Sequence, residues 1–132
     1  MTLEFLDGTQ LEVITIIGGP KLIGGVMRDT LQIEVDPSVA TLEQLKTLFK
    51  DPIKCRTLYG YNEAVDESTD QVSTVRETIG EGYTIFVSVA DEERHIAAPP
   101  GYLQPDTIEE VYVVQIAQLT YAEYMLEHGL SN

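Results

Sequence analysis

The residues best spaced for chemistry lie between Asp66 and Glu77, where oxygen-bearing side chains match part of a calcium-binding loop. Four of them stand at positions 1, 3, 5 and 12 of the template, namely Asp66, Ser68, Asp70 and Glu77. Carboxylate and hydroxyl oxygens suit Ca²⁺, but Gln71 replaces the glycine that permits the sharp turn of such a loop. We interpret the segment as a solvated acidic loop, and keep a calcium-binding module or an enzyme as a less favoured alternative.

Other motifs lack the residues that their chemistry requires. The glycine spacing of residues 19–26 matches a phosphate-binding loop, but Gly25-Val26 stands where that loop needs a lysine and a hydroxyl residue. His95 and His128 are the only histidines, and neither is at metal-ligand spacing from the other or from Cys55. We predict no catalytic residue, no metal site and no cofactor, and we interpret Cys55 as a small core residue.

Charge is distributed unevenly along the chain of 132 residues. The formal net charge is -14, and residues 63–132 hold fourteen acidic side chains against two basic ones, Arg76 and Arg94. A field of this sign repels phosphates and argues against direct nucleic-acid binding. No stretch approaches eighteen uninterrupted apolar residues, and the first residues lack the pattern of a cleaved signal peptide. We expect a chain that neither enters membranes nor is secreted by a signal peptide.

Residues 1–96 are predicted to form an α+β domain that is mostly antiparallel β-sheet, of the sandwich or barrel kind. Asp7-Gly8 favours a tight hairpin turn that leads into a strand at 11–17. Gly18-Gly19-Pro20 is predicted to end that strand. Residues 30–35 alternate at period two, so we expect three of them to face the core: Leu31, Ile33 and Val35.

A short helix is predicted at 42–50. Thr41 and Gln44 form a capping box, in which each side chain bonds the other's backbone N–H group, and Asp51-Pro52 ends the helix. Residues 53–61 then favour a strand.

A polar loop is predicted at 62–70. Beyond it, residues 72–79 and 83–89 flank Gly80-Glu81-Gly82, and this pattern indicates a hairpin with a three-residue turn.

The end of the chain is predicted to be a tethered helix. Residues 97–106 hold three prolines, which favour a semi-rigid linker. Residues 107–129 begin with a second capping box, from Thr107 to Glu110, and close with Gly129, a residue suited to a helix C-terminus. These signals predict one C-terminal helix over 107–129.

The predicted C-terminal helix carries an apolar stripe that we expect to bind a partner, because an isolated amphipathic helix is marginal in water. The candidate interaction residues are Tyr112, Ile116, Leu119 and Leu126. A competing interpretation is a strand from Val111 to Leu119, since Val111-Tyr112-Val113-Val114 is rich in strand-favouring residues. The two matched end signals favour the helix.

Three segments resemble small proteins encoded in the tail or baseplate regions of tailed phages and prophages of Gram-positive bacteria. They are residues 31–35, residues 41–49 and above all residues 109–123. The resemblance implies a non-enzymatic virion or assembly component with a β-rich body, which contacts other copies of itself or phage-assembly proteins. It also implies a location in the virion or in the bacterial host cytoplasm, and it supplies no site residue.

A different class of function remains open. The acidic residues from Glu63 to Glu127 could stand in for phosphates, which would make the chain an inhibitor that occupies a nucleic-acid-binding surface of a host protein. Such mimicry needs carboxylates arranged on one face. Acidic composition more often serves solubility, so we favour the structural or interaction protein.

Overall fold

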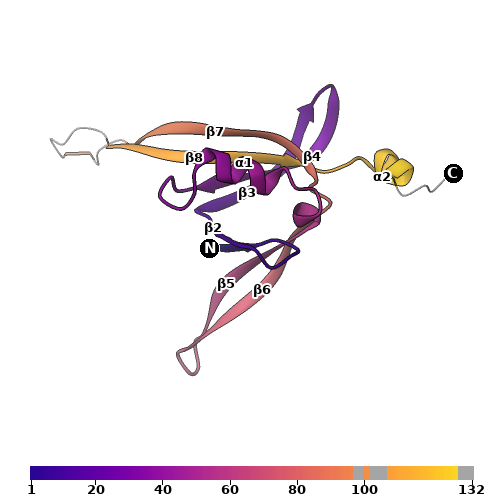
Figure 1. Cartoon of the computed structure of the whole chain (residues 1–132). Helices are drawn as coiled ribbons and strands as arrows, with labels where there is room; N and C mark the ends of the chain where they lie inside the picture. The colour runs from indigo at the N-terminus through magenta and orange to yellow at the C-terminus, as the bar shows by residue number, and fades with distance from the viewer. Residues whose placement is uncertain (97–99, 102–106, 128–132) are drawn as a thin grey trace.

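The structure is a computed structural model that describes residues 1–96, 100–101 and 107–127. Within these residues the chain forms two four-stranded antiparallel sheets and little helix (Figure 1). Sheet A has the strand order β2 (Gln10–Glu12), β1 (Thr2–Glu4), β5 (Thr57–Asp66), β6 (Gln71–Glu81). Sheet B has the order β3 (Thr15–Ile23), β4 (Val26–Val35), β8 (Thr107–Ala117), β7 (Ile85–Ile96). The predicted class, mostly antiparallel β-sheet, is confirmed.

The hydrophobic core lies where the two sheets meet the helix α1 (Leu42–Phe49). Phe5, which follows β1, packs edge-on against Phe49 of α1 with 5.2 Å between ring centroids. Both rings are buried, and burial of large apolar side chains is the main stabilising term of such a core. Sheet B contributes the residues that were predicted to face inward, and they are buried: Leu31, Ile33 and Val35.

Helix α1 forms as its local sequence predicts. The Thr41 hydroxyl accepts a hydrogen bond from the Gln44 N–H at 3.1 Å, and the Gln44 side chain accepts one from the Thr41 N–H at 2.9 Å. The helix therefore satisfies two of its free N–H groups with its own residues. Its buried side chains, Leu45 and Phe49, hold it against the core.

The first hairpin is shorter than predicted. Gly8 has a φ of 90°, but Asp7 does not have a positive φ, and a loop over residues 5–9 replaces the predicted two-residue turn. The expected strand at 11–17 is divided into β2 and β3. Gly18-Gly19-Pro20 does not end a strand, because it lies inside β3. Proline lacks the N–H group of a sheet ladder, and an edge strand such as β3 tolerates that loss. The turn that follows is Gly24-Gly25, with φ values of 57° and 84°.

The middle of the chain pairs differently from the prediction. Residues 54–56 form a short 3-10 helix, η1 (Lys54–Arg56), and the strand that follows, β5, continues to Asp66 through most of the expected polar loop. The predicted hairpin of 72–79 with 83–89 is wrong, since β6 pairs with β5 and β7 pairs with β8. Alternation at period two locates a strand, but it does not identify the partner of that strand.

The predicted helix over 107–129 is also wrong. Residues 107–117 form β8, a central strand of sheet B, and among the described residues of this stretch the helical part is α2 (Tyr121–Glu127). Val111 and Val113 are buried on one face of β8, and Val114 and Ile116 are buried towards the core. A strand covered on both faces has a nearly continuous apolar sequence, which a helical stripe resembles. The competing strand interpretation is the correct one.

Residues 107–117 therefore belong to the β-sheet body. The proposed linker lies between strands that are neighbours, because Ile96 of β7 pairs with Thr107 of β8. Residues 97–99 and 102–106 of that segment lie outside the described residues. His128 and Gly129, expected at the end of the helix, lie outside them too.

Candidate interaction surfaces

Three hairpins extend beyond the core in different directions (Figure 1). In the view of Figure 1, β5 and β6 project downwards, β7 and β8 project to the left, and the turn between β3 and β4 points upwards. Two-stranded projections cannot bury their own apolar side chains. The hairpins are therefore the parts of the described structure that are best placed to contact another molecule.

The β5–β6 hairpin projects over residues 62–66 and 71–78, which we call the ribbon. It is two-stranded over 62–66 and 71–75, and residues 76–78 form its base, opposite residues 59–61. All residues of the ribbon are exposed. β1 pairs with β5 only as far as Tyr61, so among the described strands no third one lies beside residues 62–66 and 71–75. Val65 and Val72 lie directly opposite each other and are 61% and 59% exposed, and Val75 on the same strand as Val72 is 40% exposed. Apolar side chains thus occur on both strands without cover.

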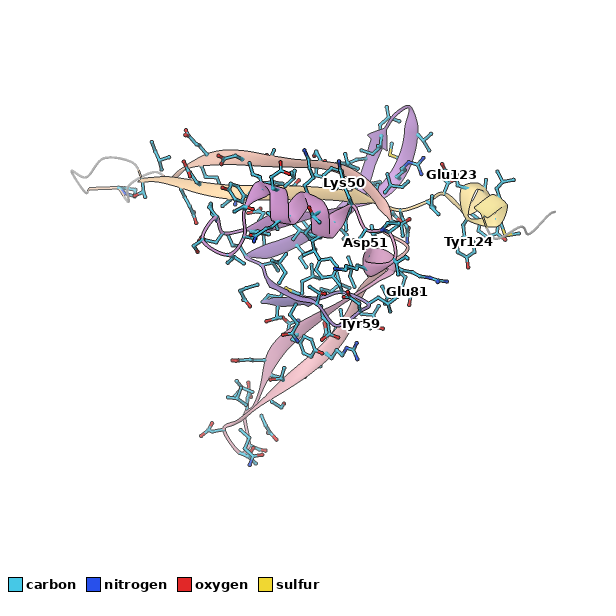
Figure 2. All side chains as sticks on the ribbon, viewed as in Figure 1. Lys50, Asp51, Tyr59, Glu81, Glu123 and Tyr124 are labelled. Carbon is cyan, nitrogen blue, oxygen red and sulfur yellow. The ribbon has the colours of Figure 1, made fainter. Side chains whose placement is uncertain are left out.

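Polar contacts fix the base of the ribbon to sheet A. The Tyr61 hydroxyl donates a hydrogen bond to Glu4 Oε2 at 2.7 Å, and Arg76 Nη2 lies 3.0 Å from Glu4 Oε1. The Arg76 guanidinium also lies 3.7 Å from the ring centroid of Tyr59, a residue labelled in Figure 2. The hydrogen bond lowers the pKa of Glu4 and raises that of Tyr61. The ribbon therefore leaves the body from a fixed base.

The tip of the ribbon holds the first residues that match the calcium-binding loop, but the expected final ligand is not near them. Asp66 accepts hydrogen bonds from the N–H and the hydroxyl of Ser68, at 3.0 and 2.7 Å, and these lower its pKa. Glu77, the expected final ligand, lies on β6 opposite Gly60. It stands six residues beyond Gln71, so about 20 Å of strand separates it from the turn. Among the described residues no group of three or more acidic, histidine or cysteine side chains could hold a metal ion.

The far part of the β7–β8 hairpin is acidic, and we call residues 91–94 and 107–110 the acidic arm. It carries five carboxylates and one basic residue, Arg94. Glu93 and Glu110 lie directly opposite each other, which is an unfavourable like-charge pair. Arg94 forms an ion pair with Glu34, with 2.5 Å between Arg94 Nη1 and Glu34 Oε2. The Glu34 side chain is only 3% exposed. The acidic arm therefore presents a net negative surface.

A carboxylate of the short helix α2, that of Glu123, binds sheet B. Glu123 closes a capping box with Thr120, since it accepts from the Thr120 N–H at 2.9 Å and its own N–H donates to the Thr120 hydroxyl at 3.2 Å. Both oxygens of Glu123 also bind the Arg28 guanidinium, with 2.8 Å between Nη2 and Oε2. The Arg28 hydrogen bonds, with a smaller contribution from Thr120, lower the pKa of Glu123 to about 2. Sequence reasoning placed this capping box too early, at Thr107.

The four predicted interaction residues do not share one helix face. Tyr112 and Ile116 lie on β8, where Ile116 is fully buried in the core and Tyr112 packs against it. Leu119 lies in the connection between β8 and α2, and Leu126 lies on α2 with 80% of its surface exposed. Of the four, Leu126 is the one that is free to contact another protein.

Leu119 lines a hollow of about 440 Å³ between α2 and the body of the protein. Tyr124 on α2 and Glu81 at the end of β6 also line it, and both are labelled in Figure 2. The remaining lining is mixed: Leu6, Pro52 and Ile53 are apolar, and Arg56, Thr57, Gly82 and Thr84 complete it. Apolar side chains and two charged ones, Arg56 and Glu81, therefore share the hollow.

Cys55 is buried, as expected of a core residue, and its Sγ lies 3.6 Å from the Phe49 carbonyl oxygen. Burial raises the pKa of this thiol to about 12, so the nucleophilic thiolate is scarce at neutral pH. The backbone of His95 lies on β7, while its side chain and all of His128 lie outside the described structure.

The ribbon is the surface that sequence reasoning missed. A strand was predicted at 72–79, within β6, but the polar residues of 62–66 indicated a loop rather than the partner strand. The only available signal was the pair of valines, Val65 and Val72, on either side of a turn-forming segment.

Comparisons with protein-family models, with curated protein sequences and with solved structures find no match to this chain. Within the described residues, no helix has the length and apolar character needed to cross a membrane.

Proposed function

We propose that this chain is a non-enzymatic structural component of a larger protein assembly and that the ribbon is its principal contact surface. The observation that carries the proposal is the exposure of every residue of 62–66 and 71–78, on a hairpin whose base is fixed to the body. An isolated two-stranded ribbon is marginal in water. Val65, Val72 and Val75 gain burial only if another protein covers them.

The assembly that we propose is the tail or baseplate of a phage or prophage, with the virion as the final location. The support for this class is the resemblance carried by residues 31–35, 41–49 and 109–123. The projecting hairpins are compatible with it, because subunits that interlock need elements that extend beyond their own cores. Contacts of this kind require no cofactor and no catalytic residue.

The distribution of charge argues against the alternative of nucleic-acid mimicry. Most of the acidic residues from Glu63 to Glu127 lie either in the acidic arm or in the ribbon and the turn at its tip, and these two parts project in different directions (Figure 1). A mimic needs carboxylates in a row on one face. The structural role therefore accounts for the shape of the molecule better than mimicry does.

Composition of the assembled particles tests the proposed function. Particles produced by the encoding genome would be purified, and their proteins counted by quantitative mass spectrometry. We expect this chain at a fixed ratio to the other tail proteins. A variant with Val65→Asp and Val72→Asp should fold but be depleted from the particles, whereas the matched variant Ile17→Asp with Leu22→Asp, on β3, should be retained. Absence of the wild-type chain from the particles contradicts the proposal.

A further inference from the structure

The edge strands of the two sheets differ in how well they are protected against pairing with another strand. An edge strand presents unpaired N–H and C=O groups, and proteins block such edges with short strands, proline, lysine, bulges or charge. At one edge of sheet A, β2 has only three residues. At one edge of sheet B, β3 carries Pro20 and Lys21 in its middle. Both edges are therefore poorly suited to pair with a strand of another molecule.

The other edge of sheet B is protected by charge and by an irregularity. β7 carries three successive acidic residues, Asp91 to Glu93, and its register with β8 shifts between Phe86 and Ser88. The part of β8 that extends beyond β4 is also acidic, with Glu109 and Glu110. Two such edges from neighbouring molecules repel each other.

The remaining edge, β6, has no proline, no lysine, no bulge and no net charge over Gln71–Thr78. That stretch contains no proline and no lysine, and its charges, Arg76 and Glu77, cancel. The register shift between β5 and β6 falls at Leu58 and Tyr59, below the ribbon. Eight residues of strand-favouring sequence are thus open along one side. Their own charges cancel, and the other acids of the ribbon and its tip lie on β5 and in the turn: Glu63, Asp66, Glu67 and Asp70.

We infer that the free edge of β6 pairs in antiparallel fashion with the same edge of a second copy of this chain. Two ribbons then form one four-stranded sheet, which relieves the marginal stability of each ribbon alone. A second copy is the favoured occupant because neutral edges can approach each other, while the acidic arms keep copies of this chain from pairing elsewhere. Antiparallel pairing of one strand with itself gives a closed, two-fold symmetric contact. This inference rests on the proposed function, since it names the partner of the ribbon.

The edge itself can be blocked without removing a contact of the body. Ser73 and Val75 are exposed and lie on one face of β6. In the variant Ser73→Lys with Val75→Lys, self-pairing brings positive charges of the two copies together on one face. The matched control is Ile17→Lys with Leu22→Lys, which places the same added charge on the exposed edge strand β3.

The test measures the mass of the full chain by sedimentation from about 1 µM to about 1 mM, a range that covers weak and moderate contacts. We expect the mass of the wild type to rise from 14.7 kDa towards twice that value. The β6 variant should associate at least about tenfold more weakly, and the β3 control should behave like the wild type. A wild type that stays at 14.7 kDa throughout, or a β6 variant that associates like the control, overturns the inference.

Hydrogen exchange gives a readout that needs no substitution. In the wild type, outward-facing amides of 71–78 should exchange about tenfold more slowly once about nine tenths of the chains are paired, while the free edge of β3 should not change with concentration. Equal concentration dependence at both edges overturns the inference. A chain that is present in particles but does not self-associate leaves the proposed function intact. If the chain pairs through β6 but is absent from particles, the pairing stands and the proposed function fails.

Discussion

At the residue scale, Glu123 links local structure to tertiary structure. It closes the capping box of α2 and also binds Arg28, a residue of β4 that is distant in the sequence. The two-oxygen contact with Arg28 requires the ionised carboxylate, and the pKa of Glu123 is accordingly about 2 instead of 4.5. Because the folded pKa is the lower one, the contribution of this contact is fully present above about pH 4.5 and is lost as the pH falls towards 2.

The substitution Glu123→Gln should release α2 from sheet B at neutral pH without unfolding the core. The neutral amide cannot form the charged, two-oxygen contact with Arg28. NMR shifts of the backbone amides of residues 120–126 should move towards disordered values in the variant. In the wild type the same shifts should move only between pH 4.5 and pH 2.

Glu67→Gln, at the exposed tip of the ribbon, is the matched control and should leave α2 unchanged. If the amide shifts of residues 120–126 depend on pH in the same way in the wild type and in Glu123→Gln, this carboxylate does not hold α2.

At the scale of elements, the sequence predicts what is local and misses what is distant. The capping box of Thr41 and Gln44 and the alternation of residues 30–35 depend on neighbours in the chain, and both are present in the structure. The partner of β6 and the identity of β8 depend on packing against strands far away in the sequence. The apolar residues of 111–116 fit a helix stripe and a doubly covered strand equally well, and only the presence of β4 and β7 decides between them.

Ile116 and Leu126 differ in burial and therefore in their expected contribution to stability, although the sequence predicted them in one apolar stripe. Ile116→Ala should lower the free energy of unfolding by about 2–5 kcal/mol, because it leaves a cavity in the core. Leu126→Ala removes an exposed side chain and should change it by less than about 0.5 kcal/mol. Urea unfolding of the two variants measures the difference. Similar losses for both would place the two residues in one environment and contradict the observed strand.

At the scale of the whole molecule, charge and shape together restrict how copies can meet. The chain has a net charge of -14, and the acidic arm projects away from the ribbon (Figure 1). Repulsion between acidic surfaces disfavours most approaches between two copies, and it acts least at the neutral edge of β6. Little of this was predictable from the sequence, because Val65 and Val72 become an exposed pair only once β5 and β6 are known to be partners.

A cysteine scan along β6 tests the central claim, that this edge pairs with a second copy, most directly. Each position from Gln71 to Thr78 would be replaced singly by cysteine and mildly oxidised. Cys55 does not interfere because it is buried and its pKa is about 12. We predict that covalent dimers peak at the positions nearest the two-fold axis and fall away on either side, with almost none for Ile17→Cys on β3. A scan in which no β6 position exceeds the Ile17→Cys control would contradict the account.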